Sequence, residues 1–228
     1  MIVGAASSFG AGLVKKFKAA GDRIIATHNR TFSGQESGGV FRRPLDLQDE
    51  ASIAALTRWV TDGAFKIDVA VFAAGILLGR SLADYDFQQI DRVMAVNFSG
   101  QAKLLHGLLP TFNDGGQVIL VSSISALGGS YDPVYAASKG AILSFVKALA
   151  RNLAPRLRVN AVAPGLIKDS SMYHEMSEET IESHIQGTPT RQLLLPDDLA
   201  SIIVDLTGPH WRQLNGECIS VNGGRYVR

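Results

Sequence analysis

Short apolar segments alternate along this sequence with longer segments in which apolar positions recur at helical spacing. The apolar segments predict strands at residues 2–3, 23–26, 40–42, 69–72, 118–122, 158–162 and 217–221. Helical spacing predicts helices at residues 11–20, 50–61, 86–109, 134–152 and 196–206. Strands that are apolar at nearly every position are typical of a parallel sheet covered on both faces. The alternation therefore predicts an α/β fold, a doubly wound parallel sheet of about seven strands with helices on both faces.

The domain organisation follows from the continuity of this rhythm. No internal repeat, low-complexity tract or Pro/Gly-rich linker interrupts it, so residues 1–228 are expected to form a single Rossmann-type domain. The least regular stretch, 168–192, is polar and contains Met172, Tyr173, His174 and Met176. We interpret it as a mobile lid over the substrate, although a plain surface helix accounts for these side chains equally well.

Composition and charge narrow the classes of function. The chain is 46% hydrophobic and 19% charged with a formal net charge of +1, which excludes a disordered chain and gives no basic surface for nucleic acid. Cys218 is the only cysteine, and the five histidines show no zinc-binding spacing, so no metal is expected. No apolar run is long enough for a membrane span, and no signal peptide precedes the first motif. We expect a cytoplasmic protein.

A glycine-rich turn joins the first predicted strand to the first helix. The segment runs from Gly4 through Ser7 and Ser8 to Gly10. Glycines let the backbone approach a pyrophosphate closely, and the helix N-terminus supplies N–H groups and positive dipole to that anion. The two serines can add hydroxyl donors. This turn predicts a dinucleotide site, although an ordinary tight turn is the simpler alternative.

The end of the second strand bears on the choice of dinucleotide. A site specific for NAD would place Asp or Glu there to bind the ribose 2′-hydroxyl. Asp22 lies before that strand, at its opposite end, whereas His28, Asn29 and Arg30 follow it. Arginine pairs with a 2′-phosphate, so these residues favour NADP, with NAD as the alternative.

A tyrosine and a lysine four residues apart are the candidate catalytic pair. Tyr135 and Lys139 lie in an Ala-rich run that is predicted to be helical, where positions i and i+4 share one face. A nearby ammonium group is expected to lower the pKa of the phenol, so that Tyr135 exchanges a proton with an alcohol oxygen near neutral pH. A tyrosine and a lysine at this spacing occur by chance in many helices, so the pair indicates catalysis only together with the motifs around it.

Six features in chain order resemble the motifs of the short-chain dehydrogenase/reductase family: the glycine turn, Asp46-Leu47, Asn97, Ser122-Ser123, Tyr135 with Lys139, and Pro164-Gly165. The likeness spans essentially the whole chain. In the family's glycine turn a threonine and a middle glycine are common, and Val3 and Ser8 stand at those positions here.

The resemblance implies which further residues contact the cofactor. The aspartate of Asp46-Leu47 would contact adenine. Ala73-Ala74-Gly75 occupies the family's asparagine-containing segment but lacks both asparagines, so contacts there would come from the backbone. Pro164-Gly165, with Ile167, matches the turn that contacts the nicotinamide carboxamide.

The resemblance also implies catalytic roles. Tyr135 would transfer the hydroxyl proton, and Lys139 would lower its pKa and bind the nicotinamide ribose. Asn97 would help to hold a water near the lysine. The serine that orients the substrate is Ser123 if the following small residues are aligned, and Ser122 if the usual interval to the tyrosine is counted; we prefer Ser123.

The implied reaction is hydride transfer between a nicotinamide and a carbonyl or secondary alcohol. NADPH-dependent ketone reduction, similar to that of the 3-oxoacyl carrier-protein reductases, is the first expectation. Alternatives are an NAD-linked dehydrogenase of sugars or secondary alcohols and a non-catalytic dinucleotide-binding sensor. Residues 86–109 and 134–152 are long helical segments with many small and apolar positions, and the resemblance implies that they pair in a homodimer or homotetramer.

Overall fold

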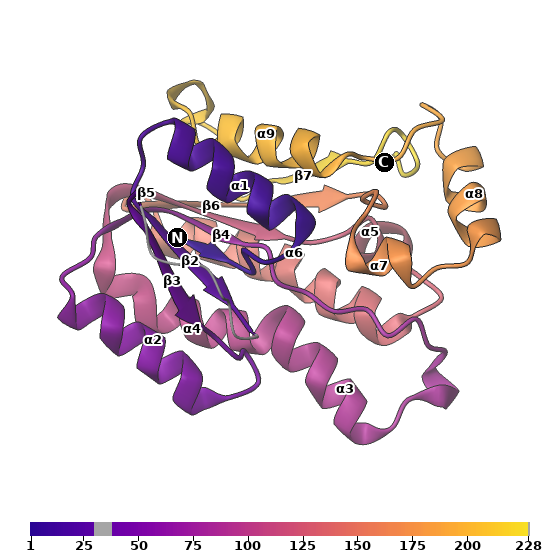
Figure 1. Ribbon diagram of the computed structural model, residues 1–228, viewed down its shortest axis with the longest axis horizontal. Coiled ribbons are helices and arrows are strands. Elements are labelled where there is room, and N and C mark those ends of the chain that lie inside the picture. The colour runs from indigo at the N-terminus through magenta and orange to yellow at the C-terminus, as the bar shows by residue number, and fades with distance from the viewer. Residues whose placement is uncertain (30–37, 228) are drawn as a thin grey trace.

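The computed structural model describes residues 1–29 and 38–227, and within these ranges the strands form one parallel sheet (Figure 1). In chain order the strands are β1 (Ile2–Val3), β2 (Ile24–His28), β3 (Val40–Pro44), β4 (Ile67–Phe72), β5 (Phe112–Val121), β6 (Leu157–Pro164) and β7 (Cys218–Val221). Their spatial order is β3-β2-β1-β4-β5-β6-β7. The order reverses at β1, and such a switch point is where doubly wound sheets bind ligands. The predicted fold class is confirmed.

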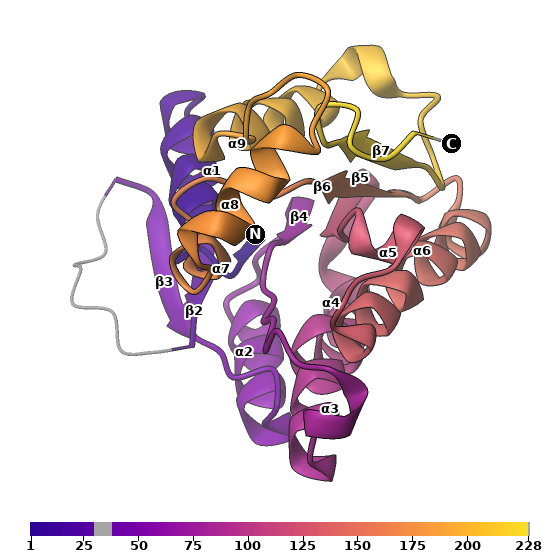
Figure 2. The same cartoon turned by 90° about the vertical axis from the view of Figure 1, so that its right-hand side faces the viewer.

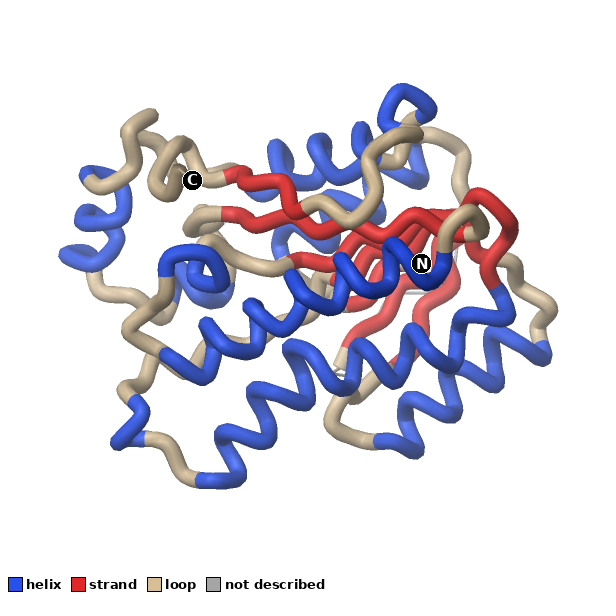
Figure 3. The backbone as a smooth tube through the Cα atoms, turned by 180° about the vertical axis from the view of Figure 1, so that it is seen from behind, coloured by secondary structure: helices blue, strands red, loops and turns tan. Residues whose placement is uncertain are grey.

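Helices cover both faces of the sheet, as Figures 1 and 3 show. On one face α1 (Ser8–Ala19) and α9 (Pro196–Leu206) pack over β1 and β2 through residues such as Leu13 and Ile203. On the other face lie α2 (Glu50–Asp62), α4 (Gly100–Leu108) and α6 (Pro133–Leu153). Their buried residues, Leu56, Leu104 and Ile142 among them, form the second core cluster. Burial on both faces explains why the strands are almost uniformly apolar.

The helix predicted at residues 86–109 is confirmed, with a π-helical turn in its middle that was not predicted. The structure has α3 (Phe87–Met94), a π-helical turn (Ala95–Ser99) and then α4 without a break. Such a turn inserts one extra residue into an α-helix. In this turn the side chain of Asn97 bonds to the main chain of Ile76, a partner that local periodicity cannot reveal.

Short helices gather at the edge of the sheet where the strands end (Figures 1 and 2). They are α5 (Ser125–Gly128), α7 (Ser171–His174) and α8 (Glu178–Gln186), and the last two lie within the predicted lid. Neither α7 nor α8 has a buried residue. Short 3₁₀ turns occur at Leu82–Asp84, Leu109–Thr111 and Pro209–Trp211. Across the described residues, no helix combines the length and apolarity that crossing a membrane requires.

Candidate active site

The glycine turn brings the backbone of β1 against the end of β4. Gly4 has φ +86°, a conformation that favours glycine, and a Cβ added there would lie 2.7 Å from the nitrogen of Ala74. A Cβ added at Gly10 would collide with the carbonyl oxygen of Gly4. Both glycines are therefore required for the tight path of the chain that leads into α1.

The N-terminus of α1 is built to receive an anion. Ser7 caps the helix, since its Oγ accepts the N–H of Gly10 at 3.1 Å and donates to the oxygen of Gly4 at 3.0 Å. The hydroxyl oxygen of Ser8 is buried and has no hydrogen-bond partner among the described residues. A phosphate oxygen at the helix N-terminus would supply the partner that Ser8 lacks, so the turn fits a dinucleotide pyrophosphate.

A small cavity of about 70 Å³ lies beside this turn at the carboxyl ends of β1 and β2. Four of the predicted cofactor residues form part of its wall: Gly4, Asn29, Leu47 and Ala74. Asp46 lies next to it, with its Oδ1 accepting the N–H of Gln48 at 2.9 Å. Arg30, on which the preference for NADP partly depends, lies outside the described residues.

The segment after β4 keeps its position without the asparagines that the family has there. The N–H of Ala73 donates to the oxygen of Val3 at 2.8 Å. Gln101, a buried residue of α4, donates from Nε2 to the oxygen of Ala74 at 2.9 Å and to that of Val96 at 3.0 Å. The sequence analysis did not single out Gln101, which here fastens the strand end to the helices beneath it.

Lys139 is buried at the centre of the site. It is 3% exposed, and its Nζ donates to the oxygen of Val121, the last residue of β5, at 2.8 Å. Burial lowers the pKa of Lys139 to about 8. A Cβ added at Gly75 would lie 3.0 Å from this nitrogen, so the absence of a side chain at Gly75 leaves space beside the amine.

The pKa of Tyr135 differs in direction from the expectation. Burial raises the pKa of its phenol above the ordinary value, a hydrogen bond with the side chain of Ser123 acts in the opposite direction, and the charge of Asp132 raises it further. Lys139 Nζ lies 6.0 Å from the centre of the tyrosine ring and is turned to the main chain of Val121. The predicted lowering by Lys139 is therefore wrong for the protein without cofactor, because desolvation outweighs a cation at this distance.

The two candidate serines have different surroundings. Ser122 Oγ is buried and donates to the carbonyl oxygen of Lys139 at 2.8 Å, a bond that joins β5 to α6. The side chain of Ser123 acts to lower the pKa of the Tyr135 phenol, and its Oγ accepts the N–H of Ser125 at 3.1 Å. Of the two serines, only Ser123 affects that phenol.

Asn97 is fully buried between the strand end and the helix that carries Tyr135. It exchanges two hydrogen bonds with the main chain of Ile76, at 2.8 and 2.9 Å, and donates to Ser138 Oγ at 2.9 Å. Ser138 in turn donates to the oxygen of Tyr135 at 2.7 Å. Asn97 therefore fixes the strand end relative to α6.

The turn after β6 closes the same edge of the sheet. The N–H of Gly165 donates to the oxygen of Val221 at 2.9 Å, and the oxygen of Pro164 accepts the N–H of Ile124 at 3.1 Å. Ile167 forms a bridge with Leu194, at the far end of the predicted lid. These contacts place the turn next to residues 122–125, the serine-containing loop that follows β5.

A larger cavity, of about 770 Å³, lies between this edge and the predicted lid. The lid contributes Met172, Met176 and His184, the loop after β4 contributes Leu77 and Leu78, and Asp132 lies at the start of α6. Arg225, from the chain after β7, also lines the cavity and donates to the oxygen of His184 at 3.1 Å. Ser123 and Tyr135 do not line this cavity themselves, but their chain neighbours Ile124 and Asp132 do.

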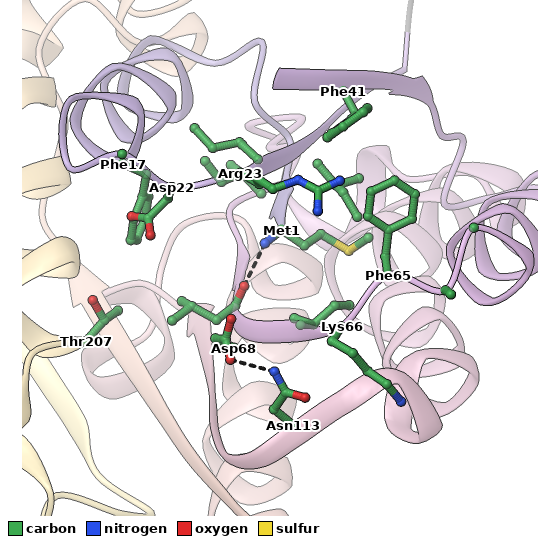
Figure 4. Close-up of a pocket in the computed structure, with 18 residues that line it drawn as sticks. Met1, Phe17, Asp22, Arg23, Phe41, Phe65, Lys66, Asp68, Asn113 and Thr207 are labelled. Carbon is green, nitrogen blue, oxygen red and sulfur yellow. Dashed lines mark hydrogen bonds between the residues drawn. The ribbon is translucent and has the colours of Figure 1, made fainter. Parts of the chain in front are cut away.

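A second large cavity, of about 710 Å³, lies at the amino ends of the strands (Figure 4). Asp22 and Arg23 before β2 and Asp68 of β4 contribute to its wall. It lies at the opposite edge of the sheet from Tyr135, so we assign it no part in the chemistry. The position of Asp22 agrees with its exclusion as a ribose ligand. Among the described residues, no group of three His, Cys, Asp or Glu side chains is arranged to hold a metal ion.

Asp132 is the residue of the site that the sequence analysis missed. It is 2% exposed and caps α6, accepting the N–H of Tyr135 at 2.8 Å. The sequence did contain a signal for the capping role, because an aspartate followed by a proline, as in Asp132-Pro133, is typical of a helix start. That signal predicts a cap, and it does not reveal the partners that Asp132 gains from distant segments.

Comparisons with known proteins agree with this geometry. Residues 4–225 match a protein-family model described as enoyl-(acyl carrier protein) reductase. The sequence is 26% identical to a D-beta-hydroxybutyrate dehydrogenase of Rhizobium meliloti (strain 1021), over 98% of this chain and 96% of that protein. It is also 26% identical to the 3-oxoacyl-(acyl-carrier-protein) reductase FabG of Vibrio cholerae, over 100% and 96%.

A solved structure has the same fold. It is a short chain dehydrogenase from Burkholderia cenocepacia J2315 in complex with NADP, which matches with a TM-score of 0.90 and 24% identity over 99% of this chain and 97% of that one. With residues 4–225 matched to the family model and the tyrosine–lysine helix set beside a dinucleotide turn, the chain belongs to the short-chain dehydrogenase/reductase family of oxidoreductases.

Proposed function

We propose that this protein reduces a ketone to a secondary alcohol with NADPH. The observation that carries the proposal is that the side chain of Ser123 acts on the phenol of Tyr135, close to the buried Lys139, at the edge of the sheet that holds the dinucleotide turn. A bound nicotinamide would supply or accept the hydride. Gly4, Gly10, Ser7 and Ser8 would hold its pyrophosphate, and Ile167 with Gly165 would border its carboxamide.

The protonation state of Tyr135 is compatible with reduction. A phenol whose pKa lies above its ordinary value near 10 is protonated at neutral pH, so Tyr135 can give its proton to the carbonyl oxygen as that oxygen becomes a hydroxyl. Ser123 would hold the same oxygen by a hydrogen bond. Positioned proton transfer of this kind contributes about 10²–10⁴ in rate.

Lys139 and Asn97 would restore the proton to Tyr135. Both side chains border the space beside Gly75, since Asn97 Oδ1 lies 3.5 Å from the position of an added Cβ. A water in that space would lie near the ammonium group and connect the site to solvent. This role extends the direct one of Asn97, which is to hold the strand end.

The choice of NADP over NAD rests on the neutral residues His28 and Asn29 at the end of β2, where an acidic side chain would repel a 2′-phosphate. The relative crystallised with NADP points the same way. An NAD-linked dehydrogenase of secondary alcohols or sugars is the competing function, because the hydroxybutyrate dehydrogenase relative is a dehydrogenase by name.

The test is turnover of the purified protein with NADPH or NADH and a panel of 3-oxoacyl thioesters, simple ketones and sugars. We expect consumption of NADPH with at least one ketone, and a kcat in Tyr135→Phe that is lower by about 10²–10⁴ with cofactor affinity retained. Cofactor binding without turnover on any substrate would favour the non-catalytic sensor. Unchanged turnover in Tyr135→Phe would remove the proposed mechanism.

We also propose that residues 168–192 form the lid and that the protein is a homodimer or homotetramer. The lid is supported by the absence of buried residues in α7 and α8 and by their place on the cavity wall. Association is supported by Phe87, which is 87% exposed at the start of α3, next to α6. Light scattering tests the assembly, and a monomer at all concentrations would contradict it.

A further inference from the structure

A buried carboxylate joins three separate segments at the mouth of the substrate cavity. Asp132 Oδ2 accepts the N–H of Gly79 at 3.0 Å and that of Arg80 at 3.4 Å. The hydroxyl of Tyr85 donates to both carboxylate oxygens, at 2.7 and 2.9 Å. Oδ1 also accepts the N–H of Tyr135 at 2.8 Å. One side chain thus has donors from the loop after β4, from Tyr85 at the end of the 3₁₀ turn Leu82–Asp84 and from the helix that carries Tyr135.

Each of these segments has a part in the site. Leu77, Leu78 and Gly79 line the 770 Å³ cavity, and Gly79 has φ +66°, which bends the loop toward Asp132. Tyr85 follows the 3₁₀ turn Leu82–Asp84 and lies 47 residues before Asp132 in the sequence. The backbone of Gly79, unlike a side chain, cannot reorient to find another partner. Loss of these bonds would free the cavity wall from α6.

We propose that Asp132 and Tyr85 are positioning residues for the reaction at Tyr135: together they hold the loop Leu77–Arg80 against the start of α6, so that the substrate meets the phenol in a fixed orientation. The role rests on the proposed function. It adds a specificity determinant on the substrate side, in a part of the chain that none of the predicted site residues occupies.

The negative charge of Asp132 has a second effect, on the pKa of Tyr135. The groups that face the Tyr135 phenol are Ser123, Lys139 and Asp132, and of the charged pair only Asp132 contributes to its raised pKa. Burial and the hydrogen bond to Asp132 also raise the pKa of Tyr85, which therefore stays protonated and keeps donating. The side chain of Arg80 donates to the oxygen of Asp84 and to Gln89, and its charge acts on Tyr85 in the opposite direction to that of Asp132.

Two conservative variants separate the effect of the hydrogen bonds between Tyr85 and Asp132, here called the tether, from the effect of the negative charge of Asp132. Tyr85→Phe keeps the ring and removes the two bonds, so we expect KM for the ketone to rise roughly tenfold with the pH profile unmoved. Asp132→Asn keeps the shape and removes the charge, so we expect the same rise in KM together with a shift of the basic limb of kcat/KM for reduction to lower pH. Removal of a nearby negative charge makes the phenol easier to ionise, which sets this direction.

The matched control is Asp49→Asn, which alters another helix-capping aspartate, that of α2, far from Tyr135. It should change neither KM nor the pH profile. Cofactor affinity and the melting temperature are measured for every variant, and Tyr85→Phe alone decides on the tether if Asp132→Asn does not fold. A wild type without turnover would remove the proposed function itself. An active wild type, with KM unchanged in Tyr85→Phe and the basic limb unmoved in Asp132→Asn, would overturn only the positioning role.

Discussion

The amine of Lys139 is buried where a charged group is costly, and this is the clearest conflict between stability and chemistry in the molecule. Its one described hydrogen bond is to a neutral carbonyl, that of Val121, so no negative charge offsets the loss of water. Such a position is tolerated at functional sites and avoided elsewhere in a core. Lys139 is therefore better explained by cofactor binding than by packing.

Replacing this lysine should stabilise the cofactor-free protein while it abolishes turnover. The pKa of Lys139 is about 8 in the folded protein and 10.5 in a solvated chain. The unfolded chain binds more protons between these values, so stability rises with pH across them, and below pH 8 the full penalty of about 3 kcal/mol applies. Lys139→Met removes this penalty and loses about 1 kcal/mol with the bond to Val121.

Denaturant unfolding at pH 7 and near pH 10 measures the effect. We expect Lys139→Met to be more stable than the wild type at pH 7, with the difference shrinking at the higher pH. A variant less stable than the wild type at pH 7 would show that the amine is not penalised in the folded state.

The two adjacent serines should separate a structural role from a chemical one. Ser122→Ala removes the bond to the oxygen of Lys139, so it should lower the free energy of unfolding by about 1–2 kcal/mol with little change in kcat. Ser123→Ala removes the hydroxyl that acts on Tyr135, so kcat/KM should fall about 10²-fold, while loss of the bond from Ser125 N–H lowers stability by about 1 kcal/mol. Unfolding curves and steady-state kinetics of the pair decide, and the reverse pattern would assign the substrate to Ser122.

At the scale of elements, a substitution at the N-terminus of α1 should affect protein stability and cofactor binding in opposite directions. Ser8→Ala deletes a buried hydroxyl that has no hydrogen-bond partner within residues 1–29 and 38–227, so the protein alone should be equally stable or slightly more so. The same change removes a hydrogen bond to phosphate, so the Kd for NADPH should rise roughly tenfold. Titration by fluorescence measures the Kd. The matched control, Ser201→Ala on the exposed part of α9, should leave it unchanged.

The elements themselves were largely predictable, because a strand buried on both faces leaves an apolar signature. The exceptions have identifiable causes. β5 begins at Phe112, whereas the sequence predicted a start at residue 118. Residues 113–116 are polar or glycine, so the apolar pattern does not mark them as strand, although Gly116 pairs with β6. The π-turn at Ala95–Ser99 depends on the contact of Asn97 with Ile76, which is 21 residues away.

At the scale of the whole molecule, the parallel sheet explains why the predicted site residues lie at one edge of the structure. Strand ends meet at one edge, so residues after β1, β4, β5 and β6 converge there whatever their separation in sequence. Ser123 and Tyr135 meet in this way. The depth of the site was not predictable, because the desolvation that raises the pKa of Tyr135 depends on everything packed around α6. The tether from Tyr85 to Asp132 was missed for the same reason.

The helix that carries Tyr135 and Lys139 also inserts Ile142, Val146 and Ala150 into the core, whereas α7 and α8 bury nothing. Tyr135 thus stands on a helix that is anchored in the core, whereas α7 and α8, which line the 770 Å³ cavity, have no fully buried residue. Substitutions in α7 and α8 should therefore disturb the position of Tyr135 little. New specificities should be sought by randomising the proposed lid, with α6 left intact.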